Sequence, residues 1–141
     1  MALHYLSWQE VFEKMRSESV LDGCPKVWGP PRGGSIVAGL LEALGRGVAV
    51  NDAEAADVFV DDIYDSGRTQ RKVEAVWGRK PWWFVIDKRK DEDRQLGWIV
   101  FPWEDPSEEA REAVTHEIVQ EVSGVKERPV APALASAVLP A

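Results

Sequence analysis

The chain has 141 residues, enough for one hydrophobic core and therefore for a single domain. Its 17 basic and 24 acidic residues give a formal charge of −7, which argues against a nucleic-acid partner held through its phosphates. One cysteine excludes an internal disulfide, and no apolar run is long enough to cross a membrane. These features predict a soluble protein of the reducing cytoplasm with neither nucleic acid nor membrane as its partner.

The first predicted helix spans residues 7–18. Ser7 and Glu10 have the spacing of a capping box. Apolar residues then recur at helical spacing, which predicts a helix packed on a sheet. These residues are Trp8, Val11, Phe12 and Met15.

A strand-loop-helix unit follows, with a strand at 26–28, a loop at 29–35 and a helix over about 36–44. Gly45 comes directly after the last apolar residue of this helix, the position at which a glycine commonly ends a helix.

The loop of this unit is rich in glycine and proline and carries one arginine. Gly33 and Gly34 allow backbone N–H groups to approach an anion closely, and the planar guanidinium of Arg32 suits phosphate oxygens. Taken alone, the loop is equally well explained as a phosphate-binding loop or as a structural turn.

Residues 58–69 carry the most specific pattern in the chain. An apolar strand leads into the adjacent carboxylates Asp61 and Asp62, and then through a short loop, 65–69, into a helix at 70–77. Ligands of open α/β sheets bind at the carboxyl ends of the strands, and a helix N-terminus offers free N–H groups to a phosphate. Carboxylates beside such a loop indicate a ligand with phosphate and hydroxyl groups, held together with a hard cation such as Mg²⁺.

This stretch resembles the motif by which type I phosphoribosyltransferases bind 5-phosphoribosyl 1-diphosphate (PRPP). The family pattern has apolar residues, two acidic residues, two apolar residues and a variant of Asp-Thr-Gly-x-Thr. Asp57 and Tyr64 depart from it, because the family usually has an apolar and an aliphatic residue there. The resemblance covers roughly residues 5–122 and implies the parallel-sheet, Rossmann-like α/β fold of this family with a minimal hood. The PRPP-binding residues that it implies are Asp61, Asp62, Asp65, Ser66, Gly67, Arg68 and Thr69.

The resemblance also assigns roles. It implies transfer of the phosphoribosyl group from PRPP to a nucleobase, a 6-oxopurine, with release of pyrophosphate. Asp61 and Asp62 would hold the ribose hydroxyls directly or through Mg²⁺, and Asp65 would be the catalytic residue that faces N7 of the base. The glycine-rich loop resembles the family's pyrophosphate-binding loop, which implies that Arg32, Gly33 and Gly34 bind pyrophosphate.

The third predicted strand of the site, 82–86, is followed by eight charged residues, 87–94. Most of these should form a solvated loop. Purine-specific members of the family have a base-contacting lysine after this strand, and Lys88 is the best match, with Lys90 second. The Trp-Ile pair at 98 and 99 resembles the hood of the xanthine-guanine branch, which implies that Trp98 stacks on the base and Ile99 contacts it through its main chain.

One departure from the family bears on activity. After a short strand at 48–50, only residues 51–56 separate it from the acidic strand, where active members usually carry a long segment that closes over PRPP. Closure excludes water from a reactive ribosyl centre. A non-catalytic PRPP- or nucleotide-binding regulatory module is therefore an alternative. A phosphate-switch domain of the receiver type is a weaker one, with Asp52 as its only counterpart to the phosphorylated aspartate.

The C-terminal part begins with a predicted helix that Asp105 caps and Gly124 ends. Residues 125–141 are rich in alanine and proline and predict an extended tail or arm. We therefore expect a phosphoribosyltransferase domain at 1–124 followed by this tail. By analogy with the family we also expect a homodimer.

Overall fold

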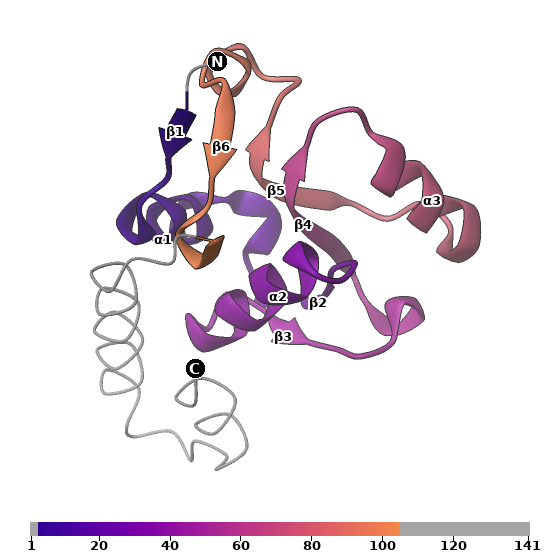
Figure 1. The fold of residues 1–141 in the computed structure, drawn as a ribbon. Coiled ribbons are helices and arrows are strands. Elements are labelled where there is room, and N and C mark those ends of the chain that lie inside the picture. Colours follow the sequence, from indigo (N-terminus) through magenta and orange to yellow (C-terminus); the bar gives the residue numbers. More distant parts are fainter. Residues whose placement is uncertain (1–2, 105–141) are drawn as a thin grey trace, which may run out of the picture.

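The computed structural model describes residues 3–104 and shows an α/β fold built on parallel strands (Figure 1). A four-stranded sheet has the order β3-β2-β4-β5, and a separate two-stranded sheet pairs β1 with β6. All pairings are parallel. The elements are β1 Leu3–Tyr5, α1 Trp8–Ser17, β2 Lys26–Trp28, α2 Gly33–Ala43, β3 Val48–Ala49, β4 Val58–Tyr64, α3 Arg68–Trp77, β5 Trp82–Asp87, α4 Asp91–Arg94 and β6 Trp98–Val100, with 3₁₀ turns at Ser19–Leu21, Ala53–Ala55 and Pro102–Glu104.

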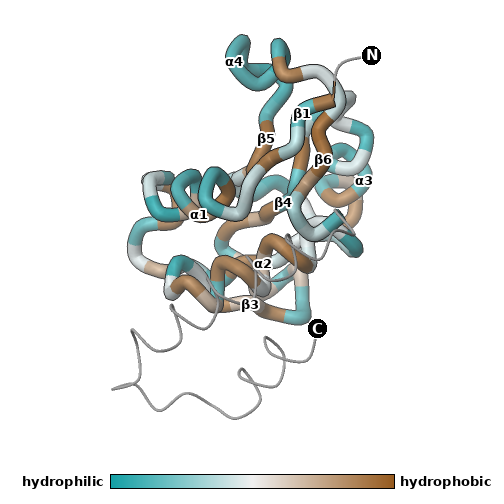
Figure 2. Tube along the Cα trace, turned by 60° about the vertical axis from the view of Figure 1, so that its left-hand side comes forward, coloured by the Kyte–Doolittle hydropathy of each residue, from teal (hydrophilic) through white to brown (hydrophobic). Residues whose placement is uncertain are grey.

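Helices cover both faces of the four-stranded sheet. The side chains of Val58 and Val60 point to one face and join the main core, which includes the buried residues of α1 and α2. Phe59, between them, points to the other face and packs with Val73 of α3 in a smaller cluster. Figure 2 shows the resulting pattern, with a largely apolar α2 against the sheet and polar residues along much of α1 and α3.

The first helix forms as predicted. The Ser7 hydroxyl accepts from the Glu10 amide at 3.0 Å, and the Glu10 carboxylate accepts from the Ser7 amide at 3.2 Å. The four apolar residues expected on its inner face, Trp8, Val11, Phe12 and Met15, are all buried.

Three element boundaries near the site differ from the prediction, and one of them is the start of α3 at Arg68 rather than at residue 70. Helix α2 begins at Gly33 rather than at residue 36, because the amide of Gly34 already bonds to the carbonyl of Pro30. Strand β4 continues through Asp61 and Asp62 to Tyr64, since β5 pairs with it along that whole length.

Other differences concern exposure. Val73, Val76 and Trp77 have the spacing of one apolar helix face, but Val76 is 69% exposed and Trp77 is exposed as well. Only the first two turns of α3 bury residues, namely Gln70 and Val73. Asp87 and Asp93, expected in a solvated loop, are buried.

The N-terminal strand β1 was not predicted at all. It has three residues and depends on its pairing with β6 at the other end of the described chain. Residues 3–104 contain no helix that is long and apolar enough to cross a membrane. The predicted helix from Asp105, the expected domain boundary after residue 124 and the tail at 125–141 lie outside the described residues.

Candidate functional site

The turns after β2 and β4 meet at the same edge of the sheet, because these strands are adjacent and parallel. They enclose an open cleft of about 190 Å³. Two sequence motifs that lie far apart in the chain therefore form one site. The residues that line it are Pro30, Pro31, Arg32, Gly33, Asp61, Asp62, Ile63 and Thr69.

The glycines of the first loop are required by its close approach to β4. A β-carbon at Gly33 would overlap the carboxylate of Asp62. A β-carbon at Gly29 would overlap the backbone of Gly34 and the carbonyl of Val60. The peptide bond between Pro31 and Arg32 in this loop is cis. The loop is thus fitted directly over the acidic strand, with the Arg32 side chain exposed at the cleft.

The two acidic residues have different environments. Asp61 is buried, and its Oδ1 accepts from the Asp62 amide at 2.9 Å while its Oδ2 accepts from Gln70 Nε2 at 3.3 Å. Burial, with the adjacent Asp62 carboxylate as the next cause, raises the pKa of Asp61 to about 8. Asp62 is only half-buried, and its Oδ1 accepts from the Ile63 amide at 2.8 Å. Asp62 is therefore the more accessible carboxylate of the pair.

Gln70 was not recognised from the sequence as a site residue. It lies in the first turn of α3 and is buried, and its side-chain amide donates a hydrogen bond to the Asp61 carboxylate. The signal was available, because Gln70 and Val73 are three residues apart on the inner face of a predicted helix. A polar residue at an inward position of that kind needs a buried partner.

The second loop turns tightly at Gly67, where φ is +82°, and α3 begins directly after it. The Ser66 hydroxyl accepts from the Arg68 amide at 3.3 Å, and Arg71 Nη1 donates to the Ser66 carbonyl at 3.3 Å. Tyr64 packs closely on Gly67, since a β-carbon there would overlap its hydroxyl. Of the predicted residues in this loop, Thr69 lines the cleft, whereas Asp65, Ser66, Gly67 and Arg68 are its chain neighbours outside the lining.

The predicted base contacts lie beyond the cleft lining. Lys88 Nζ donates to the carbonyls of Asp93 at 3.0 Å and Gly97 at 2.6 Å, so this lysine ties together the segment between β5 and β6. Trp98 is 61% exposed on β6, whereas the side chain of Ile99 is buried in the main core. None of these three residues lines the cleft.

An ion pair lies at the end of β5, between buried Asp87 and exposed Arg89. Burial raises the pKa of Asp87, but the hydrogen bonds and the charge of Arg89 outweigh this effect, so that its pKa lies below the usual range. Arg89 binds the carboxylate through Nε at 2.9 Å and Nη2 at 2.8 Å, and its guanidinium lies 4.0 Å from the ring centroid of Tyr64. The arginine thereby links the segment after β5 to the end of β4.

The short segment at 51–56 is fixed in place. Lys80 Nζ donates to the carbonyls of Ala53 at 3.0 Å, Glu54 at 2.8 Å and Ala56 at 2.6 Å. Asp52 caps this turn by accepting from the Glu54 amide at 3.0 Å. The segment forms a short 3₁₀ turn, and none of its residues lines the cleft.

A divalent cation can be tested against the carboxylates at the cleft. Within residues 3–104 no group of three His, Cys, Asp or Glu side chains is arranged to hold a metal. Mg²⁺ does not need such a group, because it is usually held by one or two carboxylates together with waters and substrate phosphates. Asp62 fits this role, whereas both oxygens of Asp61 are already engaged by protein donors.

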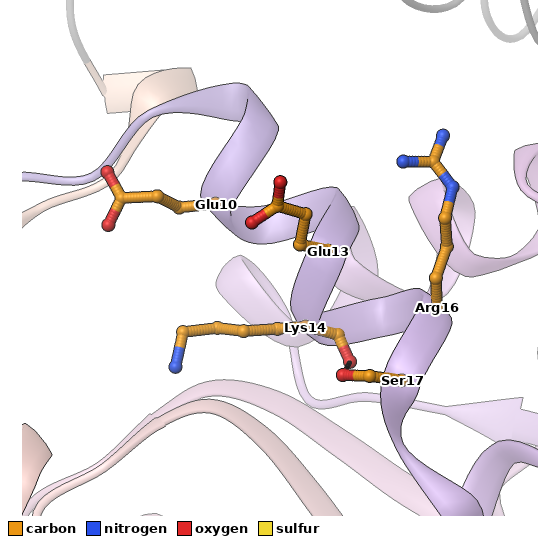
Figure 3. A pocket seen from close by; sticks show the side chains of 5 residues that line it. All are labelled: Glu10, Glu13, Lys14, Arg16 and Ser17. Carbon is orange, nitrogen blue, oxygen red and sulfur yellow. Dashed lines mark hydrogen bonds between the residues drawn. The ribbon is translucent and has the colours of Figure 1, made fainter.

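A second hollow lies along the polar face of α1 (Figure 3). Glu10, Glu13, Lys14, Arg16 and Ser17 line it, and the Ser17 hydroxyl donates to the carbonyl of Lys14 at 3.3 Å. It contains none of the predicted site residues.

Comparisons with known proteins agree with this architecture. No protein-family model matches the chain, and no curated protein matches its sequence. Among solved structures, the chain is similar to the Helicobacter pylori xanthine-guanine-hypoxanthine phosphoribosyltransferase, with a TM-score of 0.53 and 16% sequence identity. The match covers 78% of this chain and 97% of that one. The chain therefore has the parallel α/β fold of the type I phosphoribosyltransferases, as predicted.

Proposed function

We propose that the protein is a phosphoribosyltransferase that transfers the 5-phosphoribosyl group from PRPP to a nucleobase, a 6-oxopurine, and releases pyrophosphate. The observation that carries this proposal is the cleft itself, where the Pro30–Gly33 loop faces the acidic pair and Thr69. A PRPP molecule needs a phosphate loop, a pyrophosphate loop and a group for its ribose hydroxyls, and the cleft offers candidates for all three.

In this proposal the acidic pair binds the ribose. Asp61 and Asp62 would hold its hydroxyls, directly or through Mg²⁺, with Asp62 as the residue that reaches the cation. When bound, Mg²⁺ would offset the negative charge that develops on the departing pyrophosphate.

The 5′-phosphate and the pyrophosphate group of PRPP would each bind at one of the two loops. The backbone amides of 65–69, with the hydroxyls of Ser66 and Thr69, would bind the 5′-phosphate at the start of α3. Arg32, Gly33 and Gly34 would bind the pyrophosphate through the guanidinium and backbone amides at the start of α2.

The base would lie between the 65–69 loop and the segment after β5. A ring nitrogen of the base attacks C1′ of the ribose, and the bond from C1′ to the pyrophosphate oxygen breaks with its electron pair. Asp65, which is exposed beside the cleft, would take the proton of the base as its general base. Trp98 would stack on the base, while Lys88 and the backbone of Ile99 would contact its edge. The same proposal includes a homodimer in the cytoplasm.

Calorimetric titration with PRPP tests the binding site. Binding should require Mg²⁺ and should be lost in an Asp61→Asn/Asp62→Asn variant, while exposed Asp52→Asn, outside the cleft lining, should bind like the wild type. Absence of binding at about millimolar PRPP, an affinity of only about 4 kcal/mol, would contradict the proposal. Asp65→Asn should then lower turnover of guanine, xanthine or hypoxanthine far more than PRPP affinity.

A second candidate function is a PRPP- or nucleotide-binding regulatory module without turnover. The observation that favours it is the Lys80 anchor, which holds 51–56 as a fixed turn where active relatives usually have a mobile covering segment. Binding needs the loops and the carboxylates, whereas transfer also needs exclusion of water. Tight PRPP binding with no consumption of any of the three purines would support this function over the first.

A further inference from the structure

Gln70 occupies an unusual position for an amide. It is only 5% exposed, although the residues beside it in the first turn of α3, Thr69 and Arg71, are exposed. Burying an amide is costly unless it is hydrogen-bonded, so its place there depends on a partner. That partner is Asp61, nine residues earlier on β4, at 3.3 Å from Nε2 to Oδ2.

This contact completes the immobilisation of the Asp61 carboxyl group. The backbone amide of Asp62 donates to one carboxyl oxygen of Asp61 and Gln70 donates to the other, so both oxygens have a protein donor. The same contact connects α3, which begins at the predicted phosphate loop, to the strand that carries the acidic pair. An apolar side chain of similar size could fill the space but would leave Asp61 Oδ2 without this donor.

We propose that Gln70 is a positioning residue for the acidic pair, and that it binds Asp61 so that Asp62 alone is presented to a Mg²⁺-bound ribosyl diphosphate. The inference rests on the proposed function and narrows it, because a contact to the ligand from Asp62 only replaces a contact from both carboxylates. Asp61 acts as an internal support, and Asp62 acts as the carboxylate that meets the ligand. Replacing a residue that orients a metal ligand in this indirect way typically costs about 10- to 100-fold in metal affinity or activity.

The test is a double-mutant cycle read out as PRPP affinity in the presence of Mg²⁺. Gln70→Met keeps the size of the side chain and removes its donor, and it should weaken PRPP binding by about tenfold. In an Asp61→Leu background, where no acceptor remains, the same substitution should cause no further loss. If Asp61→Leu alone abolishes binding, Asp61→Asn serves as the background, and there the additional loss should be smaller than in the wild type.

Gln9→Met is the matched control. Gln9 also lies in the first turn of a helix and donates to a carboxylate, Glu13, at 3.2 Å, but it is exposed on α1 and does not line the cleft. It should leave PRPP affinity unchanged. Thermal unfolding of all variants reports separately on folding.

The outcomes are distinct. Unchanged affinity in Gln70→Met, even with a lower melting temperature, would show that Gln70 only packs and would overturn the inference. Equal losses in both backgrounds would show that it acts independently of Asp61, which also overturns it. A wild-type protein that binds no PRPP would refute the proposed function itself, and the inference would fall with it.

Discussion

The carboxylate of Asp62 lies against the backbone of Gly33 so closely that no side chain could be accommodated between them. Gly33 is the first residue of α2 and Asp62 belongs to β4, so this contact joins the first loop of the cleft to the acidic strand. Its closeness explains why a glycine, with no β-carbon, is the first residue of this helix. A methyl group at residue 33 would therefore overlap the Asp62 carboxylate, and either Asp62 or the loop would have to move.

Gly33→Ala should displace Asp62 or the loop. We expect a loss of about 1–3 kcal/mol in the free energy of unfolding, as for other overpacked sites. PRPP affinity should fall by at least about tenfold, or about 1.4 kcal/mol. Urea unfolding and calorimetry measure the two effects.

Gly39→Ala, in the same helix, is the control for this substitution. A β-carbon at Gly39 would meet no atom within 4 Å. Alanine is the better helix former, so this variant should gain about 0.5–1 kcal/mol of stability and bind PRPP normally. If Gly33→Ala behaved like Gly39→Ala, the contact with Asp62 would not determine the cleft.

Lys80 should determine the order of the 51–56 turn. Lys80→Met removes three bonds from an ammonium group to backbone carbonyls, and we expect a cost of about 1.5–3 kcal/mol with faster hydrogen exchange at Ala55 and Ala56. Exposed Lys72→Met, on α3, is the matched control and should leave exchange in the turn unchanged. Unchanged exchange in Lys80→Met would show that the turn is ordered by other contacts, and would remove the support for a non-catalytic module.

Arg46 ties the C-terminal end of α1 to the segment before β3. It donates to the carbonyls of Met15 at 2.9 Å and Glu18 at 2.6 Å, and it pairs with Asp22 at 3.2 Å. Arg46→Met should therefore cost about 1.5–3 kcal/mol in urea unfolding, chiefly through the lost carbonyl bonds. Arg79→Met should cost less than about 0.5 kcal/mol, because Arg79 is 94% exposed in its ion pair with Glu74. Similar costs for the two variants would contradict this assignment.

The local patterns were sufficient for most of the fold. The capping box at Ser7, the apolar strand before Asp61 and the glycine after α2 each act within a few residues, and the sequence shows such features directly. The juxtaposition of the two loops followed from the parallel sheet that the family resemblance implied. Strand β1 could not be predicted in this way, since its three residues are stabilised by a partner about 95 residues later.

The side-chain partners at the site were harder to predict. Lys88 was expected at the base because of its position after β5, but its ammonium group binds two carbonyls of the following segment. The run of charged residues likewise gave no indication that Asp93 is buried. Its carboxylate accepts a hydrogen bond from the amide of Asp87 at 2.8 Å. Partners of this kind depend on how a loop folds back, and charge spacing alone does not specify that.

Asp61, within β4, and Asp87, at the end of β5, should give opposite dependences of stability on pH. The pKa of Asp61 is raised to about 8 in the folded protein by burial and by Asp62, whereas an unfolded aspartate has a pKa of about 3.9. The unfolded state therefore loses its proton first, and the contribution of Asp61 to stability is complete below about pH 4 and is lost as the pH rises through about 8. Asp61→Asn should remove this loss, so its stability relative to the wild type should increase between about pH 5 and about pH 9 in urea unfolding without ligand.

Asp87→Asn provides the comparison of opposite sign. The pKa of Asp87 lies below its usual range in the folded state, because Arg89 outweighs the effect of burial. Its contribution to stability is therefore present above about pH 4 and is lost as the pH falls through the folded-state pKa. Asp87→Asn should be most destabilising at neutral pH and lose its effect in acid, whereas Asp61→Asn should have its largest stabilising effect in alkali. If the Asp61→Asn and wild-type stability curves ran parallel from about pH 5 to about pH 9, the pKa of Asp61 would not be raised in the folded protein, and this prediction would be wrong.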